Sequence, residues 1–243
     1  MLKRNIFIVV FGITLLIAAV GAQTATAAGC LPRLFGFQAA YDFPHVYSDL
    51  KPDPAVVWGQ LDSGFRYVVM ENKRPEDRVN AHLMIGAGSF HETDAEQGLA
   101  HYLEHLLFCG SENFPPGELI KYFQKIGMRF GNDANAHTGF FYTVYDLHLP
   151  AGDRKTLQEG LVVMTDYAAG ALIPEAEVER ERAVILAEKR TRDSVGYRTY
   201  KASLNFELAG ARVINRYPIG IEPVIKKADR AALKGFYDTW YRP

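Results

Sequence analysis

The chain has 243 residues, a formal net charge of −1 and a hydrophobic content of 48%. These are the proportions of an ordinary globular protein, so a disordered or fibrous chain is excluded. The absence of a basic block argues against a nucleic-acid-binding protein. Two cysteines, Cys30 and Cys109, are too few for a disulfide framework, and a chain of this length can bury a core without one.

Residues 1–29 have the three-part layout of a secretory signal peptide. Lys3 and Arg4 form a charged start, residues 6–20 are apolar, and residues 22–28 are mostly small. The apolar stretch is shorter than the roughly 20 residues that span a bilayer as a helix, so a cleaved signal is favoured over a retained anchor. The sequence therefore predicts an exported protein, either periplasmic or secreted.

The site of signal cleavage is not fixed by the sequence. Residues 20–22 and residues 25–27 both suit a signal peptidase. The alternative is a lipoprotein site at residues 28–30, in which Cys30 becomes the acylated first residue. Ala27 stands three residues before Cys30, where a leucine would be usual, so a lipid anchor at Cys30 is the less favoured alternative and stays open.

The next part of the chain changes from irregular to strand-like. Residues 30–55 lack a clean period and carry several prolines, which predicts an N-terminal leader that docks on the following domain. We expect strands at residues 56–61, 65–70 and 79–85, with a turn at residues 62–64 between the first two.

The remaining predicted elements are mostly helices, opened by proline or closed by glycine. One strong strand candidate, residues 140–149, is rich in aromatic and β-branched residues. Strands precede helices without a regular βαβ alternation, so we expect one α+β layered domain over residues 56–243. The expected helices cover residues 96–108, 117–126, 157–169, 174–192, 201–208 and 231–241.

The first of these helices carries an array typical of a metal site. His101, Glu104 and His105 are offset by three and four residues and therefore share one helix face. Two imidazoles one turn apart can both bind a single tetrahedral Zn²⁺, and Glu104 lies beside them, placed to take a proton from water. The alternative is a chance spacing of polar residues on an ordinary helix, and the array is specific enough to favour the metal site.

A zinc enzyme usually draws a third protein ligand from elsewhere in the fold. Among the glutamates of the longest predicted helix, Glu175 and Glu177 suit a solvated face near the helix N-terminus. Glu188 differs because it follows the apolar residues 183–187, and Glu181 lies two turns before it on the same face. A carboxylate on a face that otherwise packs needs a partner, and a metal is one.

Several ordered segments carry a resemblance to a known family. They are GLAHYLEHLLFCGSENFP (98–115), FGNDANAHTGFFYTVYDLHLP (130–150), EVERERAVILAEKR (177–190), RYPIG (216–220) and FYDTWYRP (236–243). The inverted order H-x-x-E-H marks the inverzincins. Together the segments resemble the M16 family, which includes pitrilysin, insulin-degrading enzyme and the mitochondrial processing peptidase. The resemblance covers residues 61–243.

The resemblance implies roles for the polar residues found above. One Zn²⁺ would be held by His101, His105 and Glu188, with Glu104 as the general base and Glu181 as an accessory acid. The resemblance also implies the fold of the family's N-terminal domain, which is a mixed, largely antiparallel sheet covered by helices.

A substrate-binding strand is implied in the same way. Asn135, Ala136 and Thr138 match the family's edge-strand motif, where a peptide is thought to add as a further strand. An exposed edge offers backbone donors and acceptors, so side-chain specificity would be loose. A turn residue is the alternative for Asn135, because the surrounding loop is rich in Gly, Asn and Asp.

The chain departs from the family pattern in two ways. Cys109 follows His105 by four residues, and a buried free thiol is favoured there over a fourth ligand, which would close the site. The family's catalytic unit also has two homologous halves that enclose a chamber, whereas the sequence stops at Pro243 within the first half. We therefore expect either a truncated fragment or a chain that works with a second M16-like half or subunit.

The sequence thus predicts an exported zinc-dependent metalloendopeptidase domain that hydrolyses peptides through a metal-activated water. The main alternative is a non-catalytic peptide-binding or partner subunit of the same family, which would need no metal ligands. A hydrolase that acts on another substrate with the same site is a second alternative. The intact ligand set favours the enzyme, and the missing second half favours the partner subunit.

Overall fold

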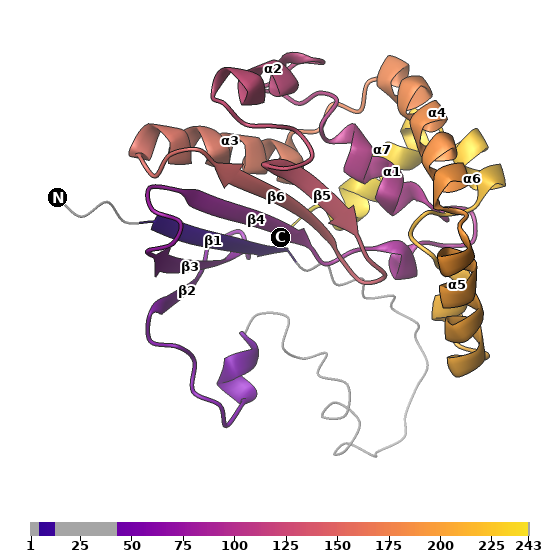
Figure 1. Cartoon of the computed structure of the whole chain (residues 1–243), viewed down its shortest axis with the longest axis horizontal. Coiled ribbons are helices and arrows are strands. Elements are labelled where there is room, and N and C mark those ends of the chain that lie inside the picture. The colour runs from indigo at the N-terminus through magenta and orange to yellow at the C-terminus, as the bar shows by residue number, and fades with distance from the viewer. Residues whose placement is uncertain (1–4, 13–42, 243) are drawn as a thin grey trace, which may run out of the picture.

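The fold is built around a six-stranded sheet with helices packed against it (Figure 1). The computed structural model describes residues 5–12 and 43–242. The strands lie in the order β2-β3-β1-β4-β6-β5. Their bounds are β1 Asn5–Gly12, β2 Val56–Gln60, β3 Arg66–Asn72, β4 Val79–Ile85, β5 Ala134–Thr138 and β6 Thr143–Leu149.

Neighbouring strands run antiparallel except β1 and β4, which are parallel. The predicted α+β class with a mixed, largely antiparallel sheet is therefore confirmed. β4 begins and ends at the expected residues, and β2 and β3 differ from the expected ranges by one or two residues.

The strand β1 lies within the segment predicted to be a signal peptide. It pairs with β3 on one side, from Asn5 opposite Asn72 to Phe11 opposite Arg66, and with β4 on the other. Signal cleavage would remove this strand and leave the facing edges of β3 and β4 without their partner. The rest of the predicted signal peptide, Cys30 and the start of the leader lie outside the described residues, so export and lipidation stay predictions.

Helices follow the strands along the chain, as expected. Asp153, Ser194 and Asp229 each cap a helix by accepting a hydrogen bond from the backbone N–H three residues later. These caps satisfy donors that a helix start leaves unpaired, and they explain why α3 and α5 begin before their apolar periodicity does. The helices are α1 Leu99–Leu106, α2 Glu118–Lys125, α3 Arg154–Ala169, α4 Glu175–Arg192, α5 Val195–Glu207, α6 Glu222–Lys227 and α7 Arg230–Trp240, with the short 3-10 helices Pro44–Tyr47, Ser89–His91 and Arg212–Asn215.

Three local expectations need correction. The helix α1 begins at Leu99 and not at residue 96, because Gly98 before it has φ of 109°, outside the helical region. The strand expected from residue 140 begins at Thr143, because Gly139 N donates to Tyr142 O in a turn that connects β5 to β6. β5 and α6 were not expected from periodicity.

The core lies between one face of the sheet and the helices. β4 buries every second residue, namely Val79, Ala81, Leu83 and Ile85, as a strand with one covered face should. α3 packs against β4 and β6, while α1 contacts β5, β6, α4 and α7 (Figure 1). The helix with the predicted metal ligands is therefore fixed between the sheet and α4.

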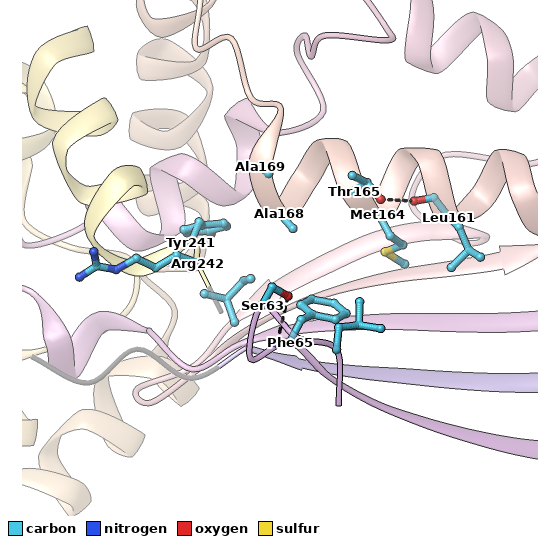
Figure 2. A pocket seen from close by; sticks show the side chains of 11 residues that line it. Ser63, Phe65, Leu161, Met164, Thr165, Ala168, Ala169, Tyr241 and Arg242 are labelled. Carbon is cyan, nitrogen blue, oxygen red and sulfur yellow. Dashed lines mark hydrogen bonds between the residues drawn. The ribbon is translucent and has the colours of Figure 1, made fainter. Parts of the chain in front are cut away.

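An apolar cavity of about 410 Å³ lies where α3 meets the sheet and the end of α7 (Figure 2). Its walls include Phe65 and Ile85 from the sheet side, Met164 and Ala168 from α3, and Tyr241. None of the predicted metal or catalytic residues lines it, so the candidate site lies elsewhere. Among the helices that the structure describes, none has the length and apolar character needed to cross a membrane.

Candidate metal centre

The helix α1 is anchored so that one of its faces is held toward α4. Leu99, Leu103 and Leu106 are almost fully buried and pack in the core. The hydroxyl of Tyr102 donates a hydrogen bond to the Val178 carbonyl oxygen of α4. These contacts leave His101, Glu104 and His105 on the side of the helix that faces α4 and β5.

The long helix α4 brings Glu188 to the two histidines. Its carboxylate oxygen Oε2 lies 3.5 Å from His101 Nε2 and 3.3 Å from His105 Nε2. The three ligand atoms all lie within 4.8 Å of one another. The packing of α1 against α4 therefore brings Glu188 to two histidines that lie 83 and 87 positions before it in the chain.

The separations of Glu188 Oε2 from the two histidine nitrogens fit a single zinc ion. Tetrahedral bonds of about 2.0–2.1 Å place neighbouring ligand atoms about 3.4 Å apart. Both distances from Glu188 to the histidines are close to this value. Two imidazoles and one carboxylate also form a donor set typical of catalytic zinc, which keeps one position for water or substrate.

Different causes lower the pKa values of His101 and Glu188. Burial lowers the pKa of His101 to about 4, so its imidazole is neutral, the form that binds metals. The hydrogen bond with His105 and the positive charge of Arg192 lower the pKa of Glu188 to about 2. Arg192 Nη2 lies 2.5 Å from the other carboxylate oxygen of Glu188 and holds that carboxylate in place.

Glu181 does not join the ligand group but contacts one of its members. Its Oε2 accepts a hydrogen bond of 3.1 Å from His105 Nδ1, which leaves His105 Nε2 directed at Glu188. Burial opposes charge on His105, but hydrogen bonds to Glu181 and Glu188 outweigh it and raise the pKa to about 9. A carboxylate behind a ligating histidine fixes the tautomer and the ring orientation.

Glu104 lies beside the ligand group and is oriented by the neighbouring strand. Thr138 of β5 donates its hydroxyl hydrogen to Glu104 Oε2 at 2.5 Å. Burial raises the pKa of Glu104 above its ordinary value, and the hydrogen bond from Thr138 opposes part of that rise. A carboxyl group with a raised pKa suits proton transfer near neutral pH.

The strand β5 ends the described sheet, next to β6, so its outer edge pairs with none of the six strands and bears only an isolated bridge from Phe130 to Ala134. Asn135 pairs with Asp146 within the strand, so the turn alternative for Asn135 is wrong. Asn135 is exposed, whereas Ala136 and Thr138 are half-buried. The three residues thus lie together on the strand whose Thr138 touches Glu104.

Cys109 is a buried free thiol, outside the histidine group. Its Sγ lies near the carboxylates of Glu177 and Glu181, but Arg180 occupies the same place, with Nη2 3.6 Å from Sγ. Burial raises the pKa of Cys109 to about 12, so the thiol stays protonated at neutral pH. The favoured interpretation of Cys109 as an unreactive buried thiol agrees with this environment.

The start of α1 has a supporting contact that was not expected from the sequence. Glu92 is fully buried, and its Oε1 accepts a 2.9 Å hydrogen bond from the Ala100 backbone N–H. The buried Arg216 donates from Nε to the Glu92 carbonyl oxygen at 3.1 Å. Lys189, next to Glu188, donates from Nζ to the Gly220 carbonyl oxygen at 2.6 Å. The sequence signal for this support was the segment RYPIG, because both Arg216 and Gly220 belong to it.

The chain is similar to a family model, to curated proteins and to solved structures. The model of the insulinase family, peptidase family M16, matches residues 67–199. The "Probable zinc protease PqqL" of Escherichia coli (strain K12) is 37% identical over 194 residues, which are 80% of this chain and 21% of that protein. The crystal structure of the first half of the periplasmic protease PqqL from Escherichia coli has a TM-score of 0.76 and 36% identity, over 81% of this chain and 42% of that one.

The matched regions cover most of this chain and a small part of the relatives. Against the complete PqqL structure, with the same TM-score and identity, the chain covers 22% of its length. The chain thus spans about a fifth of the length of the PqqL proteins it matches. The family model covers more than half of the 243 residues, and the resemblance inferred from the motifs is confirmed. The chain belongs to the M16 (insulinase) family of peptidases.

Proposed function

We propose that the chain is the zinc-binding part of an exported endopeptidase that hydrolyses peptide bonds. The observation that carries the proposal is the convergence of His101 Nε2, His105 Nε2 and Glu188 Oε2, with Glu104 beside them. Relatives described as zinc proteases support both the metal and the reaction class. A relative described as a periplasmic protease supports export.

The three converging side chains would hold one Zn²⁺. When bound there, the ion would lower the pKa of a water molecule to about 7 and polarise the scissile carbonyl group. Glu181 would keep the His105 ring oriented and support its basicity through the Nδ1 hydrogen bond. Arg192 would restrain Glu188 through its second oxygen.

Glu104 would act as the general base and then as the general acid. As a carboxylate it accepts a proton from the attacking water, and as a carboxylic acid it returns that proton to the leaving amine. The hydroxyl of Thr138 would hold one carboxylate oxygen of Glu104, so that the other oxygen faces the water. The raised pKa of Glu104 supports proton return at neutral pH.

The substrate would lie along the outer edge of β5. A peptide in extended conformation can pair with the backbone of residues 134–138 and thereby approach Glu104, which Thr138 contacts. Asn135 and Ala136 would contribute to this strand-like pairing. Backbone pairing fixes the direction and register of the peptide and leaves side-chain selectivity to neighbouring surfaces.

A second M16-like half or subunit would complete the enzyme. The chain corresponds to part of the first half of PqqL, and a complete enzyme of this class is about five times as long. Holding the peptide in a reactive geometry accounts for about 7–11 kcal/mol of barrier reduction in well-oriented reactions. We therefore expect weak hydrolysis by the chain alone and strong stimulation by the second half.

The test combines metal content with turnover of a quenched fluorescent peptide. The purified chain should bind one Zn²⁺, and His105→Ala should abolish tight binding. Glu104→Gln should keep the zinc and lose hydrolysis, because it removes a base and not a ligand. Glu118→Gln, an exposed change on α2, serves as the matched control. Equal loss of zinc in Glu104→Gln and His105→Ala would contradict the assigned roles.

A further inference from the structure

A second, polar cavity of about 920 Å³ adjoins α4 and the segment before α1, and four of its lining residues are basic. Lys189 comes from α4, Lys201 from α5, Arg212 from the 3-10 helix Arg212–Asn215, and Arg216 from the loop after it. Asp94 is the acidic residue among its lining residues. The wall of the cavity therefore carries an excess of positive charge.

Within the described part of the chain, this excess is not neutralised by ion pairs. Arg216 pairs with Asp94. Lys201 has no carboxylate within ion-pair distance among the described residues, and its Nζ lies 4.6 Å from the centre of the Tyr217 ring. Arg212 and Lys189 donate to the uncharged carbonyl oxygens of Glu92 and Gly220, at 2.6 Å in each case.

Lys189 and Lys201 line the same cavity from two different helices, α4 and α5. An anion placed between the two ammonium groups would reduce their repulsion and gain charge-assisted hydrogen bonds. The cavity is thus electrostatically complementary to a negatively charged ligand.

The cavity volume indicates what size of ligand fits. Cavities of about 300–1,000 Å³ accommodate organic ligands or several residues of a peptide, which is more than one inorganic anion fills. The cations come from three separate segments of the chain, so they can contact several carboxylates spaced along one extended ligand. An acidic stretch of peptide has that spacing of charges.

The cavity also adjoins the elements that carry the metal ligands. Gln97 in its wall comes four residues before His101 in the chain, and Lys189 directly follows Glu188. One extended peptide can therefore contact both the cavity and the elements that carry the metal ligands.

We propose that this cavity is a binding subsite for an acidic segment of the peptide whose cleavage the metal centre performs. The subsite would favour substrates with aspartate or glutamate a few residues from the scissile bond. The inference rests on the proposed peptidase function for its biological meaning, whereas the binding itself requires neither zinc nor hydrolysis.

The test measures binding to the zinc-free chain by fluorescence anisotropy. Two labelled peptides are compared, one with several Asp and Glu residues and one with Asn and Gln at the same positions. The acidic peptide should bind at least about 10-fold more tightly, because its carboxylates make charge-assisted hydrogen bonds that the amide peptide lacks. Lys201→Gln should remove most of this difference and leave the binding of the amide peptide unchanged.

Matched variants separate a local site from a general effect of charge. Lys121→Gln removes one positive charge from α2, where Lys121 is 70% exposed and pairs with Glu118. It should leave the acidic peptide's affinity within about 2-fold, because exposed charges beyond roughly 10 Å are screened. Lys201→Glu should weaken the acidic peptide more than Lys201→Gln does and should favour a lysine-substituted peptide.

Three results would overturn the proposal. Equal affinity for the acidic and amide peptides would show that the cavity does not select charge. Equal effects of Lys201→Gln and Lys121→Gln would indicate non-specific attraction. Binding of inorganic phosphate without binding of the acidic peptide would assign the cavity to a free anion. Failure of hydrolysis with intact selective binding would instead contradict only the proposed peptidase function.

Discussion

Gly220 touches the start of α1 so closely that a Cβ atom on Gly220 would lie 2.4 Å from the Gly98 Cα. Gly98 is the N-cap of α1, and Gly220 has φ of 66°. The loop that carries RYPIG therefore meets α1 backbone to backbone. Any side chain at Gly220 must push this loop or the helix away from its position.

Gly220→Ala should destabilise the fold and weaken zinc binding at the same time. The steric overlap adds to the cost of a positive φ, and we expect about 1–3 kcal/mol beyond the effect of φ alone. Gly127→Ala measures the cost of a positive φ without a steric overlap, because Gly127 has φ of 82° and an added Cβ would have nothing within 4 Å. Urea unfolding and zinc titration measure both quantities, and equal effects of the two changes would exclude a special contact.

The buried Glu92 should make stability fall as the pH rises. Burial raises its pKa from an ordinary 4.5 to about 8, so the folded state binds this proton more tightly than the unfolded state. The free energy of unfolding should therefore decrease between about pH 5 and pH 8, by up to about 1.4 kcal/mol per pH unit.

Glu92→Gln should remove this pH-dependent contribution, because the amide keeps an oxygen for the Ala100 N–H but does not titrate. The measurement is denaturant unfolding of both proteins at several pH values, with Glu118→Gln as an exposed control. Parallel pH profiles for Glu92→Gln and the wild type would show that Glu92 does not ionise over this range.

The two glutamates of α4 should differ in their effect on zinc. Glu188→Gln should weaken zinc affinity by several orders of magnitude. Glu188 Oε2 lies 3.5 Å from His101 Nε2 and 3.3 Å from His105 Nε2, the separations expected for ligands of one zinc ion. Glu181→Gln should cost about 10–100-fold, the usual effect of losing a partner behind a ligating histidine. Competition with a chelator measures both affinities. Equal small losses would require another third ligand.

The hydrogen bond from Thr138 should lower the pKa of Glu104. Thr138→Val removes the hydroxyl that stabilises the Glu104 carboxylate, so the pKa of Glu104 should rise further. The acid limb of the pH–rate profile should then move to higher pH, whereas Thr138→Ser should preserve the wild-type limb. An unchanged profile in Thr138→Val would mean that Glu104 does not control that limb.

Loss of β1 should promote self-association. Removing residues 1–29 would leave β3 and β4 with unpaired edges over seven residues each, and such edges pair with other chains. Val9→Pro in the complete chain, which removes a ladder hydrogen bond, should act in the same direction. Size-exclusion chromatography with light scattering checks both. A monomeric and equally stable chain without residues 1–29 would show that β1 is dispensable.

The sequence by itself determined the local chemistry of this protein. The spacing of His101, Glu104 and His105 needs only the helical repeat to place them on one face, and the alternation of residues 79–85 needs only the pleat of a strand. Both patterns repeat over a few residues, so they can be read without knowing the rest of the chain. The resemblance of the ordered motifs then indicated the family and the fold, and it implied that Glu188 is the third zinc ligand.

Only the tertiary structure decided which distant residues meet. The contact of Glu188 with both histidines, of Thr138 with Glu104 and of Gly220 with Gly98 depends on how α1, α4, β5 and the loop after the 3-10 helix pack together. The buried position of Glu92 and the basic cavity have the same origin. No local period encodes these contacts, because they arise from the requirement that all elements bury their apolar faces at once.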